Sequence, residues 1–191
     1  NNIETLRWAD DHFEMIDQRI LPSEFNYISY SSAKSVADGI RLMVVRGAPA
    51  IGCAAAYGVA LEAIKIQSLD KIDFLNGMED ACKILLESRP TAINLFWAVN
   101  RMKSIIKDSQ NIDPKELSMI LLKEAHNIKA EDIKINQMMG NFGAELLSDG
   151  ANVLTHCNAG ALATAGHGTA LGVIRSAVES GKNISVIADE T

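Results

Sequence analysis

The 191-residue chain is long enough for one large domain or two small ones, and its net charge of −6 argues against nucleic acid as a partner, because nucleic-acid-binding surfaces are normally basic. Apolar residues make up 48% of the chain but aromatic residues only 5%, so the core must be built from aliphatic side chains and alanine. There is no apolar segment with basic flanks at the N-terminus and no apolar run long enough to span a bilayer, so we expect no membrane partner.

The cysteines and histidines indicate the compartment and exclude some sites. Cys53, Cys82 and Cys157 are far apart and odd in number, which suits neither a disulfide framework nor a zinc site. No pair of histidines has the spacing of metal ligands, so we expect no metal. The chain has the character of a cytoplasmic protein.

Residues 1–30 predict a small antiparallel meander. Apolar and polar residues alternate through this stretch, with a hairpin turn at 9–12 and a second break at 21–23.

A series of helices follows. Ser31 and Ser32 can cap a helix that carries Val36, Ile40 and Met43 at helical spacing. Further helices are expected over about 50–67 (alanine-rich, with Pro49 at the first helical position), over 72–87, and beyond Thr91 with one face formed by Ile93, Phe96, Trp97 and Asn100.

Asp113-Pro-Lys-Glu116 resembles a capping box and predicts the start of a long helix. Gly140 and Gly143 should weaken this helix. So long a helix could carry the chain from a first domain, 1–145, into a second, 146–191. The second part predicts one right-handed βαβ unit: a buried strand at 152–156, a glycine-rich turn, a helix from about Thr169 and a strand at 184–188.

The expected fold class is therefore α/β: a mainly helical N-terminal domain with a small antiparallel sheet, then the start of a Rossmann-like parallel-sheet domain. The chain does not begin with Met and stops just after the second parallel strand. Two parallel strands cannot make a sheet covered on both faces, so we expect a piece of a longer protein.

Cys157 is the first candidate for chemistry. If it heads a turn that leads from strand into helix, the field of the helix N-terminus would favour its thiolate over its thiol. The alternative is that it is a small apolar core residue.

Two arginines lie beside prolines at predicted helix starts, in Arg46-Gly-Ala-Pro49 and Arg89-Pro-Thr91. A guanidinium can form two hydrogen bonds to a phosphate, and a helix N-terminus adds free N–H groups. Alternatively, each arginine is an ordinary solvated residue at a helix cap.

The glycine-rich run offers a weaker signal. His167 lies within it and could face a ligand. Gly166-His-Gly168-Thr-Ala-Leu-Gly172 resembles a dinucleotide fingerprint, with Asp189 after the next strand, but the spacing is off by one. Close helix–sheet packing is the favoured interpretation of these glycines, with nucleotide binding as a minor alternative.

Three motifs in combination resemble the methylthioribose-1-phosphate isomerase family, which belongs to the superfamily of translation-initiation exchange-factor subunits. They are Met43-Val-Val-Arg-Gly-Ala-Pro-Ala-Ile-Gly52, Arg89-Pro-Thr-Ala-Ile-Asn-Leu95 and Thr155-His-Cys-Asn-Ala-Gly-Ala-Leu-Ala-Thr164. The resemblance runs in order from Leu6 to Thr191, essentially the whole chain.

The resemblance implies a homodimeric, cofactor-free enzyme of methionine salvage that converts 5-methylthioribose 1-phosphate to 5-methylthioribulose 1-phosphate. By position, Arg46, Gly47, Ala48 and Arg89 match its substrate-binding residues and Cys157 its active-site cysteine. N–H groups from Asn158 to Gly160 could hold a developing oxyanion. The catalytic aspartate of the family lies in a C-terminal region that this chain lacks. A ribose-1,5-bisphosphate isomerase and a non-enzymatic exchange-factor-like scaffold remain the alternatives.

Overall fold

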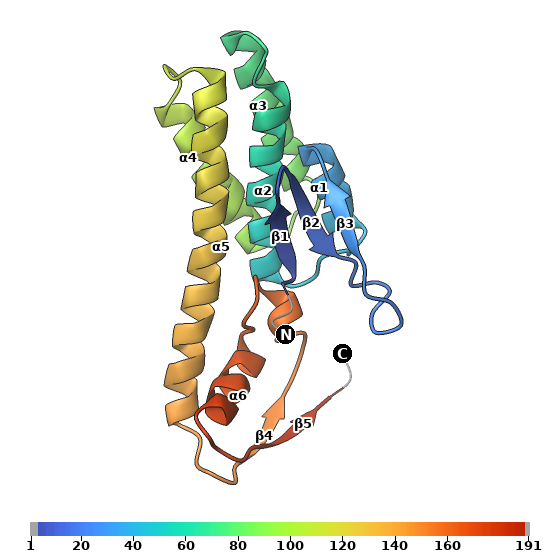
Figure 1. The fold of residues 1–191 in the computed structure, drawn as a ribbon, viewed down its shortest axis with the longest axis vertical. Helices are drawn as coiled ribbons and strands as arrows, with labels where there is room; N and C mark the ends of the chain where they lie inside the picture. The colour runs from blue at the N-terminus through green and yellow to red at the C-terminus, as the bar shows by residue number, and fades with distance from the viewer. Residues whose placement is uncertain (1–3, 190–191) are drawn as a thin grey trace.

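The computed structural model describes residues 4–189, which begin with the predicted antiparallel meander (Figure 1). Its strands are β1 (Leu6–Ala9), β2 (His12–Ile16) and β3 (Tyr27–Tyr30), in the order β1-β2-β3. Ala9 pairs with His12, so the first turn lies where the sequence predicts it. Residues 1–3, the start of the predicted meander, lie outside the described residues.

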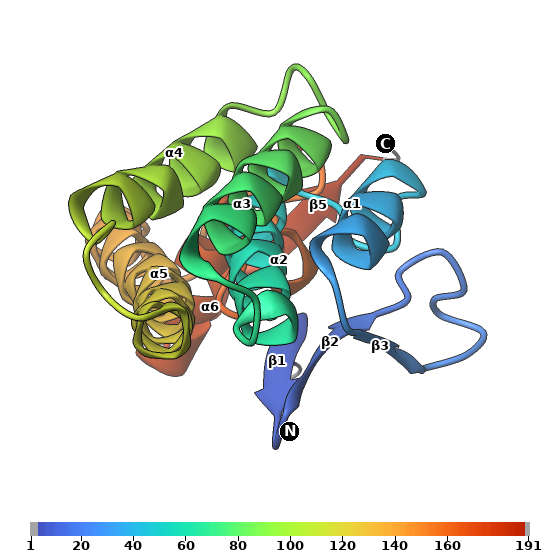
Figure 2. The ribbon, with the colours of Figure 1, turned by 90° about the horizontal axis from the view of Figure 1, so that it is seen from above.

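Helix α2 (Ala48–Ile66) is the centre of the helical region. It contacts α1 (Ala33–Arg41), α3 (Lys71–Leu86), α4 (Ile93–Asp108) and α5 (Pro114–Glu145), which surround it in Figure 2. Of its 19 residues, 13 are buried, and most of those are alanine, glycine or another small residue that lets neighbouring helices approach closely. By length and composition α2 could cross a membrane, which the sequence analysis did not anticipate, but 72% of its apolar window is buried inside the protein. That burial is typical of a core helix.

Side-chain caps fix the starts of three helices. Ser32 accepts a hydrogen bond from the Ser35 N–H at α1, as predicted, Asp70 caps α3, and Asp113 caps α5. Helix α1 ends at Arg41, so the prediction that Met43 continues it is wrong. Met43 instead has a left-handed backbone, with φ of 61°.

The face predicted for α4 is the solvent-facing one. Ile93 is 80% exposed and Trp97 50% exposed, whereas the buried residues are Leu95, Ala98, Val99 and Met102. Apolar residues recur on two sides of this helix, so helical spacing alone could not decide which side faces α2.

The long helix α5 joins the two ends of the molecule (Figure 1). Its first half packs Leu117, Leu121 and Ile128 into the core. Its second half packs against α6 (Ala170–Glu179) through glycines that were expected to weaken it: a Cβ on Gly143 would lie 2.6 Å from a Val173 methyl carbon. These glycines therefore permit close contact between α5 and α6.

Strands β4 (Asn152–Thr155) and β5 (Ser185–Ala188) pair in parallel, as predicted. The prediction that the first of them is buried is wrong, since only Thr155 is buried and Leu154 is 72% exposed. Leu154 is paired with Ile187, itself 63% exposed, so the two form an open apolar face. A larger Rossmann-like sheet and a domain boundary at residue 145 both stay predictions.

Candidate functional site

The segment that carries Arg46 is anchored by its neighbours. Val44 and Val45 are almost fully buried, and the Val44 carbonyl accepts a hydrogen bond from the Gln18 N–H at 3.0 Å. This anchoring leaves the Arg46 side chain exposed at the start of α2. Pro49 is the second residue of α2 rather than the first, because Ala48 already has helical geometry.

Gly47 joins this segment to the glycine-rich loop. Its φ of 97° is favourable only for glycine, and a Cβ there would lie 2.4 Å from the Ala163 Cα. Gly47 is therefore required by both its backbone angle and its contact with Ala163.

The second arginine precedes α4, where the buried Ser88 hydroxyl bonds to the Leu85 carbonyl. The N-cap residues of α2 and α4 are Gly47 and Ala92, which form no side-chain hydrogen bond to the helix, unlike the N-cap residues of α1, α3 and α5. The first N–H groups of α2 and α4 therefore have no side-chain cap, which leaves them suited to bind an anion.

Cys157 lies in a loop, with φ of 71°. The prediction that it heads a helix is wrong: residues 158–169 lie between it and α6, which begins at Ala170, and η1 (Ala161–Ala163), a three-residue 3-10 turn, is the helical element in that stretch. The glycine-rich run is long enough to fold into an irregular loop before helical geometry starts, so Cys157 does not stand at the first turn of α6.

Three distant side chains hold that loop in place. The Thr5 hydroxyl donates to the Ala161 carbonyl at 2.7 Å, and the Gln18 amide donates to the Leu162 carbonyl at 2.8 Å. The Asp132 carboxylate accepts from the Ala165 N–H at 2.7 Å. The loop is thus tied to the first strands and to α5.

These segments meet around one cavity of about 520 Å³. Six of the seven predicted site residues line it: Arg46, Gly47, Ala48, Arg89, Cys157 and Asn158. Gly160 does not, and its carbonyl accepts from the Ala163 N–H inside the loop. Its role as an oxyanion donor therefore stays a prediction.

Sequence reasoning missed the other half of the lining: Met43, Ile51, Thr91, Ala92, Ile93 and Asn94. Thr91 and Asn94 belong to the Arg89 motif, so their place beside Arg89 in that motif is the signal that could have identified them.

The two arginines of the cavity differ from most others in the chain. Arg7, Arg19, Arg41 and Arg101 each pair with a carboxylate, whereas Arg175 donates to the Gly166 carbonyl. Neither Arg46 nor Arg89 forms an ion pair with any of residues 4–189. Two such guanidiniums on one cavity are suited to a phosphate.

The three thiols lie in different surroundings. Cys157 is exposed, whereas Cys53 and Cys82 are buried. Burial raises the pKa of the Cys82 thiol to about 11 and raises that of Cys53 further. Cys157 is therefore the accessible nucleophile of the three.

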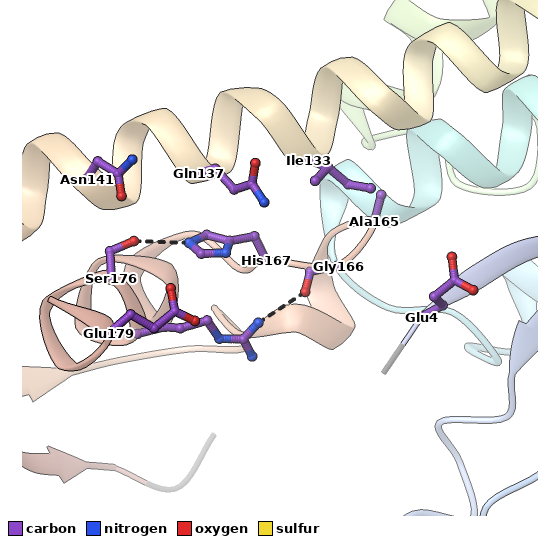
Figure 3. A pocket seen from close by; sticks show the side chains of 10 residues that line it. Glu4, Ile133, Gln137, Asn141, Ala165, Gly166, His167, Ser176 and Glu179 are labelled. Atoms are coloured by element: carbon purple, nitrogen blue, oxygen red, sulfur yellow. Dashed lines mark hydrogen bonds between the residues drawn. The ribbon is translucent and has the colours of Figure 1, made fainter. Parts of the chain in front are cut away.

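His167 lines a different cavity, of about 400 Å³, between α5 and α6. Figure 3 shows its ring pointing toward Ser176, with 3.3 Å between Nε2 and the hydroxyl oxygen. A Cβ on Gly172 would lie 2.9 Å from that ring, and one on Gly168 would lie 2.9 Å from the Gly160 carbonyl carbon. The glycines that resemble a nucleotide fingerprint thus pack against the loop and the helix pair rather than against the sheet.

Asp189, which would complete such a fingerprint, instead bonds to His156 across the ends of β4 and β5, at 2.6 Å. Among residues 4–189, no group of three or more His, Cys, Asp or Glu side chains is placed to hold a metal ion.

The sequence of this chain is similar to a family profile and to curated relatives. The profile of the Initiation factor 2 subunit family matches residues 44–191, which include the three motifs around the cavity except Met43. Curated relatives named methylthioribose-1-phosphate isomerase are 59% identical over 99% of this chain in Albidiferax ferrireducens and 52% identical over all of it in Geobacter metallireducens. The matches cover 53% and 55% of those relatives, so the chain spans about half their length.

Two solved structures share the fold. The 5-methylthioribose 1-phosphate isomerase of Pyrococcus horikoshii superimposes with a TM-score of 0.89 at 38% identity, over 97% of this chain and 60% of its own. The delta subunit of translation initiation factor eIF-2B from A. fulgidus gives a TM-score of 0.85 at 44% identity, over 99% of this chain and 55% of its own. On the profile match, which covers more than half of its residues, the chain belongs to the Initiation factor 2 subunit family.

Proposed function

We propose that this chain forms the phosphate- and thiol-bearing part of an aldose–ketose isomerase that converts 5-methylthioribose 1-phosphate to 5-methylthioribulose 1-phosphate. One observation carries the proposal: Arg46, Arg89 and Cys157, from three distant segments, line one cavity. The names of the relatives from Albidiferax, Geobacter and Pyrococcus support this choice of substrate.

The phosphate would bind between the two arginines. Each guanidinium can donate two parallel hydrogen bonds to phosphate oxygens, and the N-termini of α2 and α4 add N–H groups and partial positive charge. The binding energy would hold the sugar with its first two carbons near Cys157.

The reaction sets a specific problem, because the anomeric oxygen is esterified and the ring cannot open to a free aldehyde. The enzyme must assist ring opening and then move hydrogen from C2 to C1. Substrate and product are isomers, so no cofactor is consumed. Cys157 would act as a base or stabilise the transition state, and both a proton shift through an enediol and a hydride shift satisfy the atom balance.

Steady-state kinetics on the full-length protein test the phosphate site. Replacing Arg46 or Arg89 with Ala should cost roughly 2–4 kcal/mol of transition-state binding, by extrapolation from breaking a buried charge pair. That cost is roughly a 30- to 1,000-fold loss in kcat/KM. Lysine variants should recover part of it, because they keep the charge without the two-pronged geometry.

Arg41→Ala is the matched control, since Arg41 is an exposed arginine paired with Asp38 and does not line the cavity. It should keep nearly full activity. Near-normal kcat/KM in both the Arg46 and Arg89 variants would show that these arginines do not bind the phosphate.

A non-enzymatic, exchange-factor-like role is the second candidate, favoured by the similarity to the eIF-2B delta subunit. It predicts that the full-length protein leaves 5-methylthioribose 1-phosphate unchanged at any enzyme concentration. A ribose-1,5-bisphosphate isomerase would instead turn over the bisphosphate faster than the methylthio compound.

We also propose that the full-length protein is a cytoplasmic homodimer. Free thiols at Cys53, Cys82 and Cys157 suit a reducing compartment. The exposed apolar stripe on α5 that includes Ile135, Met138 and Phe142 is the kind of surface that a stable interface buries. Sedimentation equilibrium should give twice the mass of one chain, and a single-chain mass would contradict the dimer.

A further inference from the structure

Met43 occupies a position that usually belongs to glycine. It is the residue just past the C-cap of α1, where its N–H donates to the Ile40 carbonyl and the Val44 N–H donates to the Gly39 carbonyl. This bonding pattern ends many helices with a left-handed residue, and glycine is preferred there because it has no Cβ. Met43 adopts that conformation, with φ of 61°, despite its long side chain.

Packing does not explain why a side chain is kept there. Met43 is 44% exposed and lies outside the main core cluster, whereas Val44 and Val45 fill the core beside it. The side chain of Met43 instead lines the same cavity as Arg46 and Cys157.

The strained residues of the chain point to this cavity. Within residues 4–189, three residues other than glycine have positive φ: Asp10, Met43 and Cys157. Asp10 lies in a hairpin turn, and the other two line the cavity. Unfavourable backbone conformations that persist in a fold concentrate at functional sites.

The lining of the cavity combines charged and apolar side chains. Arg46 and Arg89 make it cationic, whereas Met43, Ile51 and Ile93 give it an apolar wall. Ile93 is 80% exposed, so it too is a large apolar side chain kept at the surface where the cavity lies.

We propose that Met43, together with Ile93, determines substrate specificity by contacting the apolar group on C5 of a sugar 1-phosphate. The inference rests on the proposed function and deepens it. A flexible thioether side chain adapts its shape to a small apolar group such as methylthio. A second phosphate at C5 would lose water against this wall without gaining a partner there.

The test compares two ligands by calorimetry in the full-length protein carrying Cys157→Ser to slow turnover. The ligands are 5-methylthioribose 1-phosphate and ribose 1-phosphate, which differ only at C5. Met43→Gly should weaken binding of the methylthio ligand about tenfold, since each methylene kept from water contributes roughly fourfold. Binding of ribose 1-phosphate should not change, and Met43→Leu should restore most of the preference.

Stability separates this role from a structural one. Met43→Gly relieves the left-handed strain, so its melting temperature should equal or exceed that of the parent protein. Asp10→Gly is the matched control, because it relieves the same kind of strain at a residue that does not line the cavity. It should leave both affinities unchanged.

The inference would be overturned if Met43→Gly lowered the affinity for both ligands equally, or if it left the preference for the methylthio ligand unchanged. If the protein prefers the methylthio ligand and Met43→Gly removes that preference, but the wild-type enzyme does not isomerise it, the proposed reaction fails while the specificity role stands. If neither ligand binds, both fail.

Discussion

At the scale of single residues, the site depends on backbone conformations that side chains disfavour. Gly47 is the clearest case, because its φ of 97° and its contact with Ala163 each exclude a Cβ. Through this contact the start of α2 supports the loop that carries Cys157. A residue of the predicted binding motif is therefore also a packing residue.

Gly47→Ala should destabilise the fold by about 2–5 kcal/mol, from the left-handed strain plus the overlap with Ala163. Gly150→Ala is the matched comparison, since Gly150 has φ of 76° but no atom within 4 Å of the added Cβ. It should cost only about 1–2 kcal/mol. Denaturant unfolding of both variants measures the difference, and equal costs would show that the Ala163 contact is unimportant.

The sequence predicted much of the residue content of the site, because Arg46, Arg89 and Cys157 each stand in a motif with recognisable chemistry. It could not predict the role of Met43, because the helical spacing that Met43 shares with Val36 and Ile40 predicts that it belongs to the same helix. The backbone angle of Met43 and the hydrogen bonds of the Met43 and Val44 N–H groups show that the helix has already ended.

At the scale of elements, the loop between β4 and α6 is held by Asp132 on α5. Burial raises the pKa of this carboxyl, against the opposing effects of the hydrogen bonds from the Ala165 N–H and Asn136. The folded state thus favours the protonated acid. The protonated Asp132 carboxyl therefore stabilises the fold at a pH below the ordinary pKa of aspartate. This stabilisation is lost as the pH rises through the raised pKa of Asp132.

Asp132→Asn removes the loss of stability at higher pH, because asparagine does not ionise. Its amide oxygen can still accept the hydrogen bond from the Ala165 N–H. Relative to wild type, the variant should be at least as stable at neutral pH, and its advantage should shrink as the pH falls toward the ordinary aspartate range. Urea denaturation across that range is the measurement. A variant that is less stable than wild type at every pH would show that the ionised carboxylate is needed to hold the loop.

Element type and order could be predicted because caps and periodicity are local signals, as at Ser32 and Asp113. Orientation and burial could not, because they depend on partners far away in sequence. The α4 face that includes Trp97 and the exposure of Leu154 are the two examples.

At the scale of the whole molecule, apolar surface gathers on the sheet formed by β4 and β5. Leu154, Val186 and Ile187 are all more than 40% exposed, and exposed apolar strands favour association with other chains. The predicted boundary at residue 145 would assign this sheet to a second domain.

Replacing Leu154 and Ile187 with Thr should therefore reduce self-association of the 191-residue chain while leaving its stability almost unchanged, since Thr keeps β propensity and both sites are exposed. Light scattering over a concentration series measures this. Ile72→Thr, at a 73% exposed residue on α3, is the control and should have little effect. Unchanged association in the double variant would show that this sheet does not drive it.

If Arg46, Arg89 and Cys157 share one sugar-phosphate site, a sugar phosphate bound there should protect the thiol from alkylation. Alkylation of the native full-length protein near neutral pH, followed by mass spectrometry, should label Cys157 first, because Cys53 and Cys82 are buried with raised pKa values. The proposed substrate, 5-methylthioribose 1-phosphate, should protect Cys157, and Arg46→Ala or Arg89→Ala should abolish that protection. Labelling of Cys157 that the sugar phosphate does not slow would show that the thiol lies outside the sugar-phosphate site, and labelling of Cys82 at the same rate would show that Cys157 is not the accessible thiol.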